Sequence, residues 1–249
     1  MIRKFLLQDI KRSFMNMGFA AGFCGLSALL AYNFVTESLG SGSVYFAIIN
    51  ILAASGFTIL LPVFPVLGYA SNFCEEYESG YYRLILSRMK PQKYAQVRII
   101  SVALSGGTIV AIPYLLVCLA AVYLETEWIT DEFFLRADTT IPMVALGQTY
   151  GVNAMVAVKV LLGFLFGAAW ALIGLAFAVW MPNKYVSLIA PFVLHQSFCI
   201  LAGRSILNPA LLVRGDDLGH LRSVMMECVW LLIAASAAMA GFRRRCRDE

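Results

Sequence analysis

Six long apolar runs, separated by shorter polar segments, constrain the fold of this chain more than any other feature. An uncharged run of about 20 residues lets a helix cross the roughly 30 Å hydrocarbon core of a bilayer. Only 14% of the 249 residues are charged and 60% are hydrophobic, whereas about a quarter of a soluble domain is charged. We therefore expect an all-α polytopic membrane protein, with residues 1–249 forming a single transmembrane domain. The expected spans are 17–35, 44–70, 99–124, 160–181, 186–203 and 223–242.

The segment 1–16 has apolar residues at helical spacing and basic residues mostly on the other side. The apolar positions are Ile2, Leu6, Ile10 and Phe14. This pattern predicts an amphipathic helix that lies in the headgroup layer. The run 17–35 is too long for the apolar core of a typical signal peptide, and no A-x-A cleavage site follows it. We therefore expect it to be retained as the first span.

Prolines should interrupt the second apolar run. Pro62 and Pro65 free backbone groups near the end of 44–70, so the helix should bend or break there. The later segment 125–158 is mixed and polar, and we expect it on the opposite side of the membrane from the termini. Within it, 141–146 is an apolar patch too short to span.

The lysines and arginines predict the orientation of the chain. With six spans both termini share a side, and 14 of the 19 basic residues fall there: four in 1–16, five in 71–98, one at Lys184 and four in the C-terminal tail. Because basic loops stay in the cytoplasm, we expect a multi-pass cell-membrane protein with both termini and the 71–98 loop cytoplasmic. These charges lie near span ends, so no nucleic-acid partner is expected.

This cytoplasmic loop combines an acidic stretch with a short apolar one. The acids are Glu75, Glu76 and Glu78. Gly80 follows and suits a helix C-cap, because glycine adopts the left-handed backbone at little cost. Tyr81, Leu84 and Ile85 fall on one face of the next helix, and Pro91 should end that helix. The two short helices would form a compact unit that another protein could grip.

The order of these residues resembles the first cytoplasmic loop of type-2 ATP-binding-cassette exporter permeases, which carries their coupling helix. The shared features are two acids, Ser79-Gly80, an aliphatic helix, a basic residue before proline, and a basic residue, Arg98, entering the next span. The family often has lysine at that last position. The alternative is a solvated loop whose charges only set the topology.

The resemblance implies a six-span permease that works as a dimer, with its first and fifth spans near the interface. Its coupling helix would dock in a groove of a separate ATPase subunit, which would bind the ATP and Mg. On this basis, the residues that couple to the partner ATPase are Glu75, Glu76, Glu78, Gly80, Tyr81, Leu84, Leu86 and Pro91.

Motifs for nucleotide, metal or catalytic chemistry are missing from the sequence. There is no G-x-x-x-x-G-K-[ST], no H-E-x-x-H and no G-x-S-x-G. Glu75-Glu76 lacks the arginine of the Glu-Glu-x-x-x-Arg motif of some membrane metalloproteases, because Gly80 stands there. The six cysteines have no C-x-x-C spacing, so neither a disulfide framework nor a metal site is indicated. We expect no enzyme activity and no cofactor in this chain.

Small and polar residues inside the spans are further candidates. G-x-x-x-G pairs occur at Gly18 and Gly22 and at Gly163 and Gly167. Small residues let helices pack closely, either within the chain, which we favour, or across a dimer. His195 and Gln196 are the deepest polar residues in any span. They should line a substrate path or make a hydrogen bond between helices, because an unsatisfied polar group is costly there.

Three charged residues lie near the expected span ends. Lys159 should extend its ammonium to the headgroups. Glu227 and Arg222 should form a pair near the outer end of the last span. None of these positions indicates catalysis.

The sequence thus predicts the transmembrane permease subunit of an ATP-driven exporter of an amphipathic or hydrophobic substrate, such as a peptide, lipid or drug. Its partners would be an ATP-binding-cassette ATPase subunit, a second permease subunit, identical or related, and the lipid bilayer. Alternatives are a non-transporting immunity or sensor subunit and a secondary transporter. Secondary transporters often have inverted repeats and an intramembrane carboxylate, and we find no repeat and no acid in the middle of a span.

Overall fold

The computed structural model describes residues 2–38, 43–53, 59–87, 89–124, 142–215 and 218–248. Throughout these ranges the regular structure is helical, without a strand. The expected all-α class is confirmed at this level.

The helices vary from 5 to 34 residues in length. The first half of the chain contains α1 (Ile2–Phe14), α2 (Met17–Asn33) with a π-helical continuation at Phe34–Ser38, α3 (Val44–Ala53), α5 (Val63–Tyr69), α6 (Asn72–Glu78) and α7 (Tyr81–Leu86). The second half contains α8 (Pro91–Leu124), α10 (Pro142–Tyr150), α11 (Val152–Trp180), α12 (Lys184–Ala202), α13 (Pro209–Arg214) and α14 (His220–Asp248).

Within the described ranges, five helices are long and apolar enough to cross a membrane. They are Met17–Thr36, Pro91–Leu124, Val152–Trp180, Lys184–Ala202 and His220–Arg245. These correspond to the first, third, fourth, fifth and sixth expected spans. The helices therefore support a membrane-embedded, polytopic protein.

The second expected span, 44–70, is not one continuous helix. α3 covers its first part, residues 54–58 lie outside the described ranges, and the chain turns at Leu61 and Pro62 before α5 begins. Pro65 lies in the first turn of α5, where the missing N–H of proline removes no helical hydrogen bond. Six spans are therefore not confirmed. The expected interruption of the helix near these prolines is confirmed.

Two expected boundaries are wrong. Pro91 starts α8 and does not end α7, which has already ended at Leu86; proline is favoured at the first position of a helix. Residues 91–98, expected in the loop, therefore form the first turns of a long helix. α11 likewise begins at Val152, within the segment expected outside the membrane.

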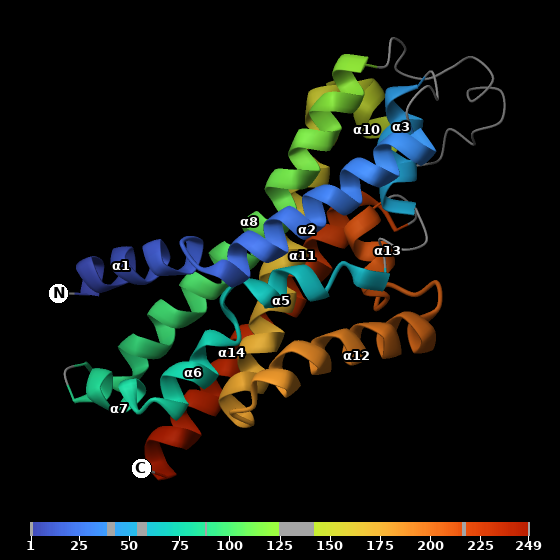
Figure 1. Cartoon of the computed structure of the whole chain (residues 1–249). Helices are drawn as coiled ribbons and strands as arrows, with labels where there is room; N and C mark the ends of the chain where they lie inside the picture. Colours follow the sequence, from blue (N-terminus) through green and yellow to red (C-terminus); the bar gives the residue numbers. More distant parts are fainter. Residues whose placement is uncertain are drawn as a thin grey trace.

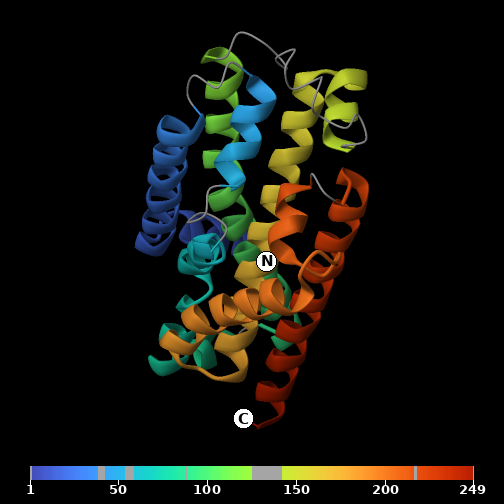
Figure 2. The ribbon, with the colours of Figure 1, turned by 90° about the vertical axis from the view of Figure 1, so that its right-hand side faces the viewer.

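α11 forms the centre of the bundle and packs against α8 and α14. Its crossing with α8 is very close, because a Cβ on Gly167 would lie 2.4 Å from the carbonyl oxygen of Gly106. Only glycine lets the two backbones approach this closely. Figure 2 shows α2 and α14 on opposite sides of the bundle. Like α12, these two helices leave most of their apolar windows uncovered by the chain.

The glycines of both G-x-x-x-G pairs face helices of the same chain. A Cβ on Gly18 or Gly22 would lie 2.2 or 2.7 Å from backbone oxygens of α5. Gly163 faces the side chain of Val110 on α8, next to the crossing at Gly167. All four positions are thus accounted for by packing within the chain.

The two ends of the bundle differ in what they carry. Figure 1 places α6, α7 and the C-terminal end of α14 at one end, and α3 and α10 at the other. α1 leaves the bundle at an angle and packs on α8 (Figure 1). From Lys4 to Phe14, the buried side chains of α1 are Asp9 and Ser13, whereas Leu6, Ile10 and Phe14 of the expected apolar stripe are half-buried. A polar network at the base of α6 explains why.

Candidate functional site

Two short helices, α6 and α7, form a hairpin, residues 72–86, at the end of the bundle that also holds the C-terminus (Figure 1). Gly80 joins them with a φ of 71°, in the left-handed region that favours glycine. Its N–H donates to the carbonyl oxygen of Tyr77 at 3.1 Å. The expected glycine turn after the acidic helix is therefore confirmed.

The inner side of the hairpin is an aromatic cluster. Phe73 of α6 packs edge-on against Tyr82 of α7 and Phe242 of α14, with ring centroids 5.4 and 5.3 Å apart. Tyr94 of α8 lies 5.5 Å from Tyr82 and 5.7 Å from Phe242. All four rings are buried, and edge-to-face pairs stabilise packing beyond the burial of area alone. The cluster therefore anchors the hairpin to the ends of α8 and α14.

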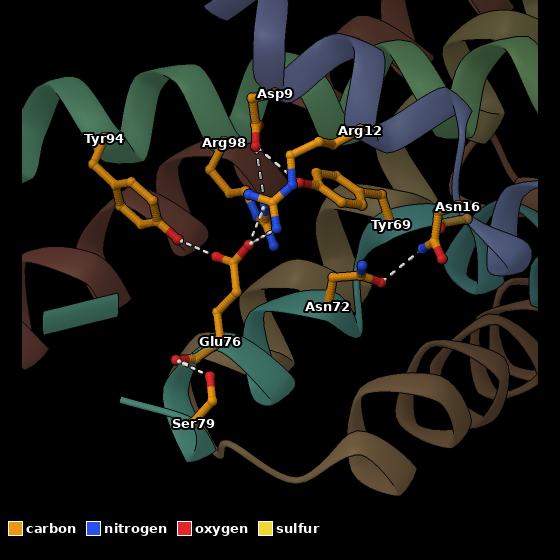
Figure 3. A network of polar contacts seen from close by, with 10 residues as sticks. Asp9, Arg12, Asn16, Tyr69, Asn72, Glu76, Ser79, Tyr94 and Arg98 are labelled. Carbon is orange, nitrogen blue, oxygen red and sulfur yellow. Dashed lines mark hydrogen bonds and ion pairs between the residues drawn. The ribbon is translucent and has the colours of Figure 1, made fainter. Parts of the chain in front are cut away.

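A charged network lies beside the aromatic cluster, with Arg98 of α8 at its centre (Figure 3). Nη1 of Arg98 lies 3.2 Å from Oδ1 of Asp9 on α1 and 3.4 Å from Oε1 of Glu76 on α6. The guanidinium also stacks on the ring of Tyr69, 4.0 Å from its centroid. Since a buried charge is tolerated only when it is paired, this arginine fixes α1 and α6 against α8.

Two phenols complete the network. Tyr69 donates to Oδ1 of Asp9 at 2.8 Å, and Tyr94 donates to Oε2 of Glu76 at 2.9 Å. Arg12 approaches Oε1 of Glu76 at 3.5 Å from the solvent side. Each carboxylate is therefore held by both an arginine and a tyrosine.

The outer side of the hairpin is uncovered. Tyr81 is 42% exposed and Leu84 65% exposed, and Glu75 and Glu78 beside them are also exposed. Oε1 of Glu75 lies 2.5 Å from the ammonium of Lys184 at the start of α12, an exposed pair that contributes little stability. These four exposed hairpin residues are called the outer surface below. Basic side chains are also present here: Arg12 lies 5.6 Å from the ring centroid of Tyr81, and Arg83 of α7 is exposed.

Several residues expected to share this surface lie elsewhere. Glu76 is only 7% exposed and its carboxylate contacts Arg98, because its position on α6 points it toward α8. Ile85, expected on the exposed face of α7, is buried, and Leu86 is half-buried. Pro91 lies beyond the hairpin, at the start of α8. The contribution of the outer surface to coupling stays a prediction.

The sequence analysis missed Asp9. It is the only acid in the segment 1–16, and it lies four residues after Phe5, whose ring is 6.5 Å from that of Tyr94. The sequence gives no signal for this role, because the contact of Phe5 with Tyr94 and the burial of Asp9 follow only from the fold. A buried carboxylate needs a partner of opposite charge, and that partner is Arg98.

His195 and Gln196 lie on α12. Gln196 donates to the carbonyl oxygen of Ile59 at 2.9 Å, which is the hydrogen bond across helices that one of the two interpretations requires. His195 is buried, and its ring lies edge-on to Trp170 and Phe166 of α11 at 4.9 and 5.8 Å. Both residues therefore contribute to helix packing, and a substrate path along them stays a prediction.

Two charged residues, Lys159 and Glu227, are buried in the bundle, although the sequence predicts both near the membrane surface. Lys159 is fully buried in α11 and donates from its ammonium to the carbonyl oxygen of Arg214. A cation there complements the C-terminal dipole of α13. Glu227 is 1% exposed in α14, whereas Arg222 is exposed. Oε1 of Glu227 has no hydrogen-bond partner among the described residues, so the expected surface pair is not formed.

The described ranges hold no group of three or more His, Cys, Asp or Glu side chains placed to bind a metal ion. The site is therefore defined by the hairpin, its aromatic cluster and its charged network. No family model matches this chain, and no curated protein or solved structure matches it either.

Proposed function

We propose that this chain is the membrane-spanning permease subunit of an ATP-driven exporter, which works with a separate ATPase subunit and a second permease, identical or related. The α6–α7 hairpin carries the proposal, because it combines an exposed outer surface with a firmly anchored base. The exported substrate would be amphipathic or hydrophobic, such as a peptide, a lipid or a drug.

The outer surface has the composition of a docking site. Tyr81 and Leu84 supply exposed apolar area, and a buried aromatic or aliphatic anchor carries most of the binding energy in an interface. Glu75 and Glu78 are exposed on the same hairpin and would meet basic groups on the partner, which favours fast association in a defined orientation. An ATPase groove with an apolar floor and a basic rim would complement it.

The base of the hairpin would transmit force. Tyr82 and Glu76 join the hairpin to Tyr94 and Arg98 in the first turns of α8. α8 is 34 residues long and crosses α11 at the glycine contact. Since packed interiors deform little, a displacement of the hairpin would move α8 against the rest of the bundle.

The test is a purification of the tagged chain from its own host cells. We expect an ATPase subunit with a phosphate loop to co-purify and to hydrolyse ATP in the complex. Tyr81→Ala with Leu84→Asp should reduce the ATPase recovered by at least about tenfold, because truncated interface anchors typically cost that much. Recovered ATPase and ATP hydrolysis per permease are the two readouts.

Leu207→Asp is the matched control, because Leu207 is a similarly exposed leucine, 45% accessible, in the connection between α12 and α13. It should leave the recovered ATPase unchanged. Full ATPase recovery and full transport by the Tyr81 and Leu84 variant would overturn the proposal.

A second candidate function, a proton-coupled secondary carrier, is favoured by one observation. Glu227 is buried in α14 without a partner for Oε1 among the described residues, and intramembrane carboxylates mark proton pathways in transporters. In proteoliposomes a carrier would transport with a pH gradient alone, and Glu227→Gln would abolish that transport. Transport that requires the ATPase and survives Glu227→Gln would favour the exporter.

A further inference from the structure

A groove runs between the start of α8 and the last turns of α14. It consists of two adjoining cavities of about 800 and 610 Å³ that share Met239 and Arg243. The larger is lined by apolar residues such as Ile100 and Leu232, and the smaller reaches Lys90. Ile100 and Leu232 are 44% and 64% exposed, so the groove opens to the surroundings of the bundle.

The charged residues that line the groove are Lys90, Arg243 and Arg244, and they lie toward one end. Lys90 and Arg243 are exposed there, and neither pairs with a carboxylate of the described residues. Gln92 and Gln96 add amide groups beside them. No acidic residue lines either cavity among the described residues. The end of the groove therefore favours a negatively charged group.

The length of the apolar part matches one leaflet. Leu232 and Arg243 are eleven positions apart on α14, which spans about 16 Å at 1.5 Å per residue. Half of the hydrocarbon core is about 15 Å. An acyl chain seated along the groove from Arg243 would therefore end near the bilayer midplane.

We propose that this groove binds an anionic phospholipid, with its phosphate at Lys90 and Arg243 and an acyl chain along α8 and α14. Basic pockets between transmembrane helices are suited to anionic headgroups. Lys90 lies between α7 and α8, so the bound lipid also tethers the hairpin end of the bundle to the membrane. The site does not depend on a bound ATPase. With the orientation proposed above it lies in the cytoplasmic leaflet.

The test uses the purified full chain in detergent, titrated with phosphatidylglycerol or with phosphatidylcholine of the same acyl chains. Bound lipid is counted by native mass spectrometry. Phosphatidylglycerol should bind more tightly than phosphatidylcholine. Lys90→Gln with Arg243→Gln should weaken phosphatidylglycerol binding on the order of tenfold, since each basic group contributes measurably to such binding. Phosphatidylcholine binding should fall less, because its choline cation offsets the charge of its phosphate, so the preference for phosphatidylglycerol should be lost.

Lys11→Gln with Lys93→Gln removes the same charge from two exposed positions that line neither cavity. This control should retain the preference for phosphatidylglycerol. Glycerophosphoglycerol, the headgroup without acyl chains, should not compete, because the groove contributes apolar contacts. Equal binding of the two lipids by the unmodified protein, or equal loss in both double variants, would overturn the proposal.

Discussion

At the scale of single residues, Arg98 reaches both of its carboxylate partners through one nitrogen. Nη1 contacts Asp9 and Glu76, whereas Nε and Nη2 have no hydrogen-bond partner among the described residues. A lysine keeps the charge but loses the planar group that stacks on Tyr69, so Arg98→Lys should retain only part of the stability. Arg98→Gln should lower the free energy of unfolding by about 3–5 kcal/mol, because it leaves the buried carboxylate of Asp9 without a cation and leaves Glu76 with only the half-exposed Arg12. Thermal unfolding of the purified variants in detergent measures both effects.

Arg12→Gln is the control for this prediction. Arg12 also contacts Glu76, at 3.5 Å, but its side chain is 46% exposed. Removal of such an exposed partner should cost at most about 1 kcal/mol. An Arg98→Gln protein as stable as Arg12→Gln would show that the network does not hold the hairpin.

The three acids of α6 show what the sequence can and cannot predict at this scale. Glu75, Glu76 and Glu78 were recognisable as a group, and Gly80 was correctly placed in the turn after them. The sequence does not predict which of these side chains faces the bundle. Adjacent helical positions point about 100° apart, and the side of α6 that packs on α8 is determined by the fold. Only the packed structure shows that Glu76 faces Arg98 while its neighbours are exposed.

At the scale of helices, the crossing of α8 and α11 allows a matched test of close packing. A Cβ on Gly167 would lie 2.4 Å from the carbonyl oxygen of Gly106, whereas one on Gly163 would lie 3.4 Å from the side chain of Val110. Alanine improves helix propensity by up to about 1 kcal/mol at either site. Gly163→Ala should therefore be neutral or stabilising, and Gly167→Ala should destabilise by about 1–3 kcal/mol through overpacking.

The thermal unfolding midpoints of these two variants show whether close packing or helix propensity determines the change in stability. A lower midpoint for Gly167→Ala alone supports the close crossing. Equal midpoints would mean that α8 and α11 separate without cost, and the crossing would then be unable to transmit movement of α8.

The helices that the sequence predicts correctly are those whose position follows from the length of an uninterrupted apolar run. Five of the expected spans have matching long helices, because a continuous apolar run of membrane length has few other stable forms. The second run failed as a single helix, since Pro62 and Pro65 leave several shorter arrangements open. Pro91 was placed at the end of a helix instead of the start, because a proline is compatible with both positions and the sequence does not distinguish them.

At the scale of the whole molecule, the proposed orientation predicts which end of the bundle is accessible from outside the cell. Ser79 lies in the hairpin turn and Ser205 in the connection after α12, and both are exposed. In a Cys246→Ser background, a membrane-impermeant maleimide should label the Ser205→Cys variant in intact cells. It should label the Ser79→Cys variant only after permeabilisation, because the positive-inside bias places the hairpin in the cytoplasm.

Cys24 is exposed and Cys199 and Cys228 are half-buried, so labelling of the Cys246→Ser protein without an added cysteine is measured as the background and subtracted. Cys74 is the described cysteine nearest the hairpin turn, and it is buried; burial also raises the pKa of its thiol, which suppresses the reactive thiolate. Labelling of the Ser79→Cys variant in intact cells would reverse the orientation. Because ATP is supplied from the cytoplasm, the outer surface of the hairpin would then be out of reach of any ATPase. The charged network around Arg98 would still hold α1, α6 and α8 together, but it would serve stability and not coupling.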